Sequence, residues 1–310
     1  MKNDSHSQRV EVNMAFKDSL PYRAVRYGFR LPSLLYTRFV TQPQVDRWLK
    51  GSELDLYVHD PKRGLLRPVT RSERLKWTMR EGLACDAVHW LDRVEPLLST
   101  NDVVFDVGAN IGTVANWFSE RTAIVHAFEP HPDNIEIITR QNKLRRTKNI
   151  SIYPHALGRE EETMQLYVKG FHGHHSLGDA ANSPTVNKMD VDVKTIDGFC
   201  DEQGLTRIDF LKIDVEGFEE DVLIGAAKML DSQGIGVVLF EIREVILTSV
   251  GRSTASVFAP LLSNGYSVID LDGHILSGEE LVKPVDGDYL AAVDAEDVAK
   301  RLADSDLQFI

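Results

Sequence analysis

The sequence has few cysteines and no long apolar runs. Its two cysteines, Cys85 and Cys200, lie far apart and lack the spacing of metal ligands. This excludes a disulfide framework and indicates two free, buried thiols in a reducing compartment. No apolar run reaches the ~20 residues of a membrane-spanning helix, and the N-terminus lacks the apolar core of a signal peptide. We therefore expect a cytoplasmic protein.

An excess of basic charge is also missing. The 310 residues carry a net charge of −12, which argues against nucleic acid as a partner because proteins that bind it usually carry a basic face. The charge is uneven, with +5 on residues 1–100 and −17 on the remainder. This asymmetry predicts two parts with different surfaces. The sequence contains no internal repeat and no low-complexity linker.

The N-terminal part, residues 1–80, is predicted to be a mainly helical extension of a domain over residues 81–310. Apolar and basic residues alternate irregularly over residues 16–50. We favour a helical lid that packs its aromatic side chains onto the main domain. The alternative is an amphipathic segment that makes peripheral contact with an anionic membrane or a glycolipid. Residues 51–72 are typical of a short hairpin, and the apolar spacing over 73–98 indicates a helix.

Beyond residue 100, strand and helix patterns alternate, which is typical of βαβ units and a mostly parallel sheet. A long loop rich in Gly, Ser, Asn and His covers residues 169–188, and such loops are more often functional than not. The predicted helices cover 133–143, 217–230 and 254–262, with shorter ones after residues 112 and 195. The predicted strands cover 102–107, 123–129, 149–157, 162–168, 189–195, 207–214, 236–242, 266–270 and 289–293.

The stretch Asp102–Gly112 carries the strongest functional signal. Three apolar residues lead into Asp106, and glycines follow at Gly108 and Gly112. A strand that ends in a glycine-rich turn before a helix opens a nucleotide-binding α/β sheet, where backbone can approach a ligand. A dinucleotide site requires a third, middle glycine, but Asn110 stands there. This favours S-adenosylmethionine, which has no pyrophosphate, over NAD.

Carboxylates at strand ends support the same ligand. Asp106 ends the first strand and suits the cofactor's ammonium group. Glu129, which lies 21 residues after Gly108, stands where a ribose-binding acid is expected. The alternative is that each acid caps the helix after it. The backbone of Ala156 is positioned to face the adenine edge.

Asp214 ends an otherwise apolar strand that should lie beside the first strand, so we expect it to point into the same crevice. Glu216 follows near the positive end of a helix dipole. For Glu219 we favour the simpler interpretation, a charge at a helix N-terminus.

These motifs resemble the FkbM-type methyltransferases, a family of S-adenosylmethionine-dependent O-methyltransferases. The resemblance covers about residues 100–245, roughly half the chain. It implies a doubly wound, mostly parallel seven-stranded α/β sheet of the Rossmann-like class I methyltransferase type. The matching pieces are FDVGANIG (105–112), AFEPHPDN (127–134), HALG (155–158), LKIDVEGFEEDVLIGA (211–226) and FEI (240–242). The predicted cofactor-binding residues are Asp106, Gly108, Ala109, Asn110, Gly112, Glu129, Ala156 and Asp214.

The resemblance also implies that a hydroxyl of a sugar, a glycolipid or a natural product accepts the methyl group. Such a hydroxyl needs a general base, and histidine titrates in the right range. We favour His174 or His175 as the base. A solvated histidine cluster is the alternative. The catalytic residues predicted are His174, His175 and Asp214, and further base candidates are His172 and Glu216.

A metal site is a further alternative. Asp214, Glu216 and Glu241, together with a loop histidine, could supply oxygen-rich ligands for a metal that binds a substrate diol. No fixed ligand spacing supports this, and no metal is predicted.

Two rival functions stay open at this point. An NAD-dependent oxidoreductase is disfavoured by Asn110, and a protein that keeps the fold and binds the cofactor without transferring a methyl group is the stronger rival. The acceptor and the oligomeric state are left open.

Overall fold

The computed structural model describes residues 10–11, 57–60, 65–68, 90–144, 149–169, 174–180, 184–283 and 285–306. The chain divides into two compact units, Met1–Ala87 and Val88–Ile310. Residues 16–50, the greater part of the helix predicted over 73–98, and Cys85 all lie outside the described residues. Within the described part, no helix is long and apolar enough to cross a bilayer.

The first unit contains a small antiparallel sheet of order β1-β2-β3. Its strands are β1 (Val10–Glu11), β2 (Tyr57–Asp60) and β3 (Leu65–Pro68). Tyr57 pairs with Pro68 and Asp60 with Leu65, so the two strands form the predicted hairpin.

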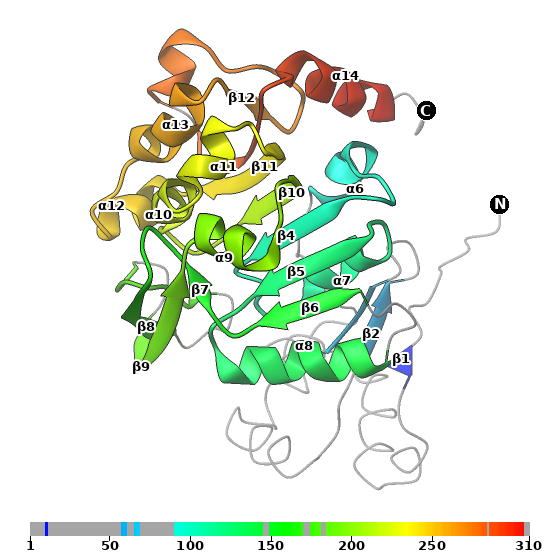
Figure 1. Ribbon diagram of the computed structural model, residues 1–310, viewed down its shortest axis with the longest axis vertical. Helices are drawn as coiled ribbons and strands as arrows, with labels where there is room; N and C mark the ends of the chain where they lie inside the picture. The colour runs from blue at the N-terminus through cyan, green and yellow to red at the C-terminus, as the bar shows by residue number, and fades with distance from the viewer. Residues whose placement is uncertain are drawn as a thin grey trace, which may run out of the picture. The chain divides into compact units, whose positions relative to one another are not determined.

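A seven-stranded sheet forms the centre of the second unit (Figure 1), in the order β12-β13-β11-β10-β4-β5-β6. Neighbouring strands from β11 to β6 are parallel, and β13 is antiparallel to both β11 and β12. This confirms the predicted doubly wound, mostly parallel fold. The strands are β4 (Val103–Val107), β5 (Ile124–Phe128), β6 (Ile150–Tyr153), β10 (Ile208–Ile213), β11 (Ile235–Ile242), β12 (Ser267–Asp270) and β13 (Gly287–Ala292).

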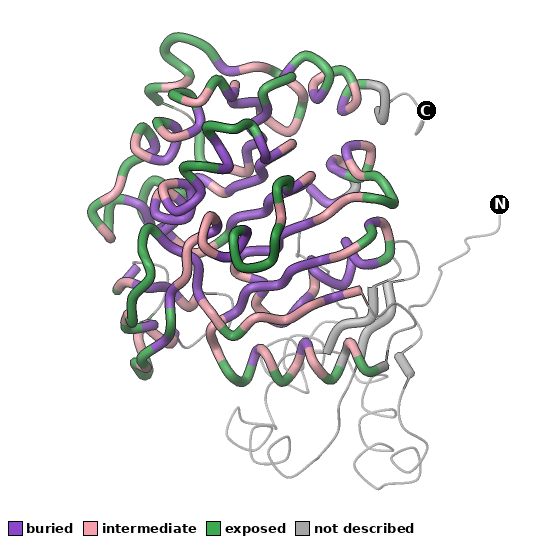
Figure 2. The backbone as a smooth tube through the Cα atoms, in the orientation of Figure 1, coloured by how far each residue is buried: buried purple, intermediate pink, exposed green. Residues whose placement is uncertain are grey.

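Helices cover both faces of this sheet, which explains why its central strands are apolar on both sides and run through the most buried part of the unit (Figure 2). Phe105 of β4 contacts Phe199 of α9 at 5.5 Å between ring centroids, whereas Phe210 of β10 contacts Phe118 of α7 at 5.4 Å. The helices are α6 (Leu91–Val94), α7 (Thr113–Ser119), α8 (Pro132–Leu144), α9 (Ile196–Gln203), α10 (Glu219–Ile224), α11 (Ala227–Asp231), α12 (Glu244–Ser249), α13 (Thr254–Ser263) and α14 (Ala295–Asp306), with short 3-10 turns η1 (Glu95–Leu97) and η3 (Gly278–Leu281).

The strand predicted over 149–157 is wrong as a single element. It divides into β6 and β7 (Ala156–Leu157), which belong to different sheets. Pro154 lies between them and has no N–H to continue the ladder of β6. The second sheet has the order β7-β9-β8, with β8 (Glu162–Lys169) and β9 (Thr185–Lys194) where two extended pieces were predicted.

The helix predicted over 217–230 is also interrupted. It divides into α10 and α11 at Gly225, where an added Cβ would lie 2.0 Å from the carbonyl oxygen of Gly158. The chain after β7 therefore passes so close to Gly225 that no side chain fits at this position, and the helix is interrupted there. The helices α12 and α14 were not predicted, because their short apolar repeats are weak signals beside their many polar residues.

Candidate active site

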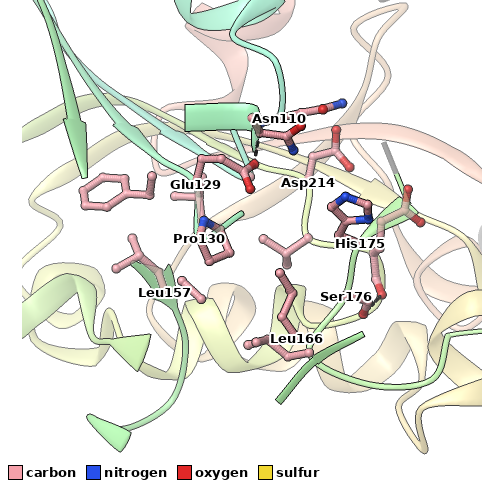
Figure 3. A pocket seen from close by; sticks show the side chains of 16 residues that line it. Asn110, Glu129, Pro130, Leu157, Leu166, His175, Ser176 and Asp214 are labelled. Atoms are coloured by element: carbon pink, nitrogen blue, oxygen red, sulfur yellow. Dashed lines mark hydrogen bonds between the residues drawn. The ribbon is translucent and has the colours of Figure 1, made fainter. Parts of the chain in front are cut away.

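A cleft opens at the carboxyl ends of β4, β5 and β10 (Figure 3). This is the edge where open α/β sheets bind their ligands. Its lining combines acidic side chains with an apolar wall. It consists of Val107, Gly108, Asn110, Phe128, Glu129, Pro130, Asn134, Ala156, Leu157, Leu166, His175, Ser176, Leu177, Asp214, Val215 and Glu216.

Glu129 follows β5 and is only 5% exposed. Its Oε2 accepts a hydrogen bond from the backbone N–H of Asn110 at 2.8 Å, and its Oε1 accepts one from the N–H of His131 at 2.7 Å. Burial raises the pKa of Glu129 to about 7, although these N–H groups act in the opposite direction. The carboxylate is thus fixed in direction while its remaining lone pairs can accept hydroxyl donors.

Close packing against neighbouring residues explains why the turn after β4 contains glycines. Gly108 has φ +76°, and a Cβ there would lie 2.0 Å from the carbonyl oxygen of Asp214. Gly112 has φ +80°, and a Cβ there would lie 2.9 Å from the side chain of Ile138. Glycine is therefore required at both positions by neighbouring protein atoms, whereas the sequence pattern had suggested close approach to a ligand.

Asp106 lies below the cleft. It is 0% exposed, it is not part of the lining, and its Oδ1 lies 3.0 Å from the ammonium of Lys212 on the neighbouring strand. Burial raises the pKa of Asp106, against the charge of Lys212. Burial alone would lower the pKa of Lys212, but the charges of Asp106 and Asp214 outweigh it and hold that pKa above its ordinary value. The two groups form a buried ion pair, in which the charge of Lys212 favours the ionised form of Asp106 while burial opposes it.

Three carboxylates follow one another along the same sheet edge. Asp214 comes directly after β10, Glu241 lies near the end of the adjacent β11, and Asp288 is directly opposite Glu241 on β13. Burial raises the pKa of Glu241 to about 7 and that of Asp288 to about 6, and the negative charge of Asp214 adds to both shifts. The side chain of Asp214 is 47% exposed.

The side chain of Glu219 accepts hydrogen bonds from the backbone of the turn after Asp214. Its Oε1 accepts hydrogen bonds from the N–H groups of Val215 at 3.3 Å and Gly217 at 3.2 Å. Burial raises its pKa to about 7. Glu219 therefore holds the backbone of this turn, in which Glu216 has φ +55°. The interpretation of Glu219 as a simple helix-end charge misses this buried contact.

The segment His174–Ala180, here called the strap, forms one wall of the cleft. Its Ser176 hydroxyl donates to the carbonyl of Glu216 at 2.7 Å, and Ser176 also pairs with Tyr167 of β8. The side chains of His175, Ser176 and Leu177 contribute to the lining, and Figure 3 shows His175 near Asp214.

Two histidines of the strap differ in their surroundings. The Nδ1 of His175 accepts a hydrogen bond from the N–H of Lys169 at 3.1 Å, which leaves the ring proton on Nε2. His174 is not part of the lining, but it lies within electrostatic range of Asp214 and Arg243. Burial lowers its pKa, and Arg243 lowers it further.

Residues 106–268, more than half of the chain, match the model of the Methyltransferase FkbM domain. The chain belongs to the FkbM methyltransferase family.

Two named relatives are less than 30% identical to this chain. Methyltransferase 1 of Beauveria bassiana (strain ARSEF 2860) is 26% identical over 144 residues, which cover 39% of this chain and 57% of that protein. The 31-O-demethyl-FK506 methyltransferase FkbM of Streptomyces tacrolimicus is 28% identical over 217 residues, 59% of this chain and 80% of that protein. The chain thus spans little more than half the length of the first of these relatives.

The similarity to solved structures is low. The FkbM methyltransferase of Methylobacillus flagellatus KT has a TM-score of 0.39 and 16% identity, over 63% of this chain and 44% of that one. TYW2 of M. jannaschii, solved in complex with AdoMet, has a TM-score of 0.37 and 16% identity, over 78% of this chain and 86% of that one.

In this FkbM methyltransferase, the structure brings together five of the predicted cofactor-binding residues. Gly108, Asn110, Glu129, Ala156 and Asp214 all line the cleft. Asp106, Ala109 and Gly112 do not line it. Which of these residues contacts a cofactor stays a prediction, and so do the catalytic roles of His174, His175 and Asp214.

Lys212 was not predicted from the sequence, where its signal is a single cation within the strand IDFLKI. His172 lies outside the described residues. Cys200 is a buried free thiol whose pKa burial raises to about 12, so it is inert. Among the residues that the structure describes, no group of His, Cys, Asp and Glu side chains could hold a metal ion.

Proposed function

We propose that this FkbM methyltransferase uses S-adenosylmethionine to methylate a hydroxyl group of a sugar, a glycolipid or a natural product. Its relative in Streptomyces tacrolimicus is named as a 31-O-demethyl-FK506 methyltransferase, that is, an enzyme acting at an oxygen. The observation that carries the proposal is the carboxylate of Glu129, which two backbone N–H groups hold in place in the lining of a cleft with an apolar wall.

The donors and acceptors of the cleft fit S-adenosylmethionine in charge and shape. Glu129 accepts hydrogen bonds from the ribose hydroxyls, because both of its oxygens are already oriented by backbone N–H groups. Ala156, Leu157 and Val215 supply apolar surface for the adenine. Asp214, the most exposed carboxylate at the other side of the turn, attracts the cationic amino-acid end.

When bound, S-adenosylmethionine supplies an electrophilic methyl group on a positively charged sulfur. The residues of this chain hold the two reactants in line, which accounts for much of the acceleration in such a displacement. The strap narrows the cleft through His175 and Leu177 and thereby excludes water. Glu241 and Asp288, which lie opposite each other on the strands beyond Asp214, accept hydrogen bonds from hydroxyl groups of the acceptor.

A base must take the hydroxyl proton. We assign this role to His174, which lies in the strap within electrostatic range of Asp214 and whose pKa is lowered by burial, a shift that favours the neutral ring. The Nδ1 of His175 is already engaged as an acceptor, so this side chain is better suited to donate from Nε2. Asp214 is the alternative base, since it is an exposed carboxylate in the lining of the cleft.

Labelled S-adenosylmethionine tests the proposal when incubated with the chain and with fractionated sugars, glycolipids and small metabolites. We expect transfer to an alkali-stable methyl ether in one of these fractions. His174→Asn should lower kcat by about 100-fold, the usual contribution of a general base, and leave cofactor affinity unchanged. His274→Asn is the matched control, since His274 is 58% exposed and paired with Glu280.

Two results contradict the proposal. Cofactor binding without transfer to any fraction favours a protein that keeps the fold without transferase activity. Transfer at the wild-type rate by the His174 variant removes His174 from the mechanism.

A further inference from the structure

Lys212 occupies the centre of a buried charge cluster between β4 and β10. Its ammonium lies 3.0 Å from Oδ1 of Asp106 and 3.5 Å from Oδ2 of Asp214. It also donates to the carbonyl oxygen of Gly108 at 3.0 Å and lies 3.4 Å from that of Val107. The side chain is 4% exposed. One buried cation therefore joins the last residues of two strands.

The charges of this cluster do not cancel. Two carboxylates surround one ammonium, and the members differ in exposure, with Asp106 at 0% and the side chain of Asp214 at 47%. The nearer partner, Asp106, is fully buried and acts as the counter-ion of Lys212. The excess negative charge consequently resides on Asp214, which faces the cleft.

Three of the four partners of Lys212 line the cleft, namely Val107, Gly108 and Asp214. The backbones of Gly108 and Asp214 also touch, since a Cβ on Gly108 would lie 2.0 Å from the carbonyl oxygen of Asp214. These contacts satisfy the remaining N–H groups of the buried ammonium, and they also tie Lys212 to the backbone of the glycine turn and to the side chain of Asp214. Through them, Lys212 holds the turn after β4 and the end of β10 at a constant separation.

We propose that Lys212 is a positioning residue for the cofactor: it orients the carboxylate of Asp214 and the Gly108 turn toward the amino-acid end of S-adenosylmethionine. This inference rests on the proposed function. Lys212 itself does not touch the cofactor. It acts through Asp214, and Asp106 neutralises the lysine so that the cationic cofactor is not repelled.

A comparison of two variants separates this positioning role from plain structural support. Lys212→Met alone would leave Asp106 buried without a counter-ion, which is strongly destabilising. We therefore compare Asp106→Asn, which keeps the lysine, with the double variant Asp106→Asn/Lys212→Met, which removes both charges. The readout is the Kd of S-adenosylmethionine by calorimetry, with the melting temperature measured alongside. Lys228→Met, at an exposed lysine paired with Asp201, is the control.

We expect the double variant to bind S-adenosylmethionine about tenfold more weakly than Asp106→Asn, the loss associated with one charge-assisted hydrogen bond. Adding Asp214→Asn should weaken binding in the Asp106→Asn background but cause little further loss in the double variant, because Lys212 acts through Asp214. Equal affinities of Asp106→Asn and the double variant overturn the inference and leave Lys212 as a counter-ion only.

Two further outcomes of the experiment also have a defined interpretation. If the double variant does not fold, Lys212→Arg replaces it, since arginine keeps the charge but not the compact ammonium that reaches two carbonyls. Weakened binding then supports the inference, and unchanged binding overturns it. If the wild-type chain binds no S-adenosylmethionine, the proposed function itself fails, and the inference fails with it.

Discussion

Individual residues of the cleft are defined by what their polar atoms already contact. Glu129 has both oxygens held by N–H groups of the protein, so its carboxylate does not need to reorganise when a ligand arrives. Its position could be predicted, because the spacing from the glycine turn places an acid at the end of the second strand. Lys212 could not, since a lysine in a strand shows its partners only when the neighbouring strand is known.

At this scale we predict that Glu129→Gln weakens S-adenosylmethionine binding about tenfold or more, because one oxygen becomes an amide that cannot accept from a hydroxyl. Calorimetry measures the effect. Glu136→Gln, on the exposed face of α8 where Glu136 pairs with Arg140, should leave the affinity unchanged. Equal affinities of the two variants would remove Glu129 from the cofactor site.

Among the elements, the strap is held by contacts with β8 and with the turn after β10. The ammonium of Lys169, 1% exposed, reaches Asp179 Oδ1 at 2.7 Å, the carbonyl of Ala180 at 2.9 Å and Thr185 Oγ1 at 3.0 Å. The sequence of this loop has hardly any periodicity, so its function could be suspected while its conformation could not be predicted. The strap is held by one buried cation of β8 and by the turn after β10.

For this element we predict that Lys169→Met loosens the strap without unfolding the sheet. The hydrogen bonds between Tyr167 and Ser176 should exchange faster, with an opening free energy lower by about 1–3 kcal/mol. Hydrogen exchange measured by mass spectrometry on peptides from β8 and the strap detects this. Lys188→Met, at an exposed lysine 4.0 Å from the ring of Tyr167, is the control. Unchanged protection would show that Lys169 does not hold the strap.

The molecule as a whole contains buried carboxyl groups that resist ionisation. Burial raises the pKa of both Glu129 and Glu219 to about 7. A carboxyl whose pKa is raised by folding binds more protons when folded, so its contribution to stability falls as pH rises from its unfolded pKa through the folded one. Burial lowers the pKa of His126 to about 4, which has the opposite effect on stability, but that effect is complete above pH 6.5.

Stability should therefore fall between pH 6.5 and about pH 8, by about 1 kcal/mol for each buried carboxyl. Glu219→Gln keeps an acceptor for Val215 and Gly217 and should flatten this slope by about the same amount. Urea unfolding at the two pH values measures it. The exposed Glu162 provides the control variant Glu162→Gln. If the Glu219 variant keeps the wild-type slope, Glu219 is ionised in the folded protein.

The sequence by itself determined the alternation of strands and helices around a mostly parallel sheet and the acids at its strand ends, although not the division of the strand at Pro154 or the helices α12 and α14. These properties follow from local patterns, since apolar runs, turn glycines and the residue that ends a strand are adjacent in the chain. Only the tertiary structure decided which acid is exposed. Asp106 and Asp214 both end strands beside the glycine turn, yet Lys212 turns Asp106 into a buried counter-ion while Asp214 faces the cleft. The physical reason is that exposure and charge pairing depend on atoms about a hundred residues apart in sequence, which meet only when the strands pair.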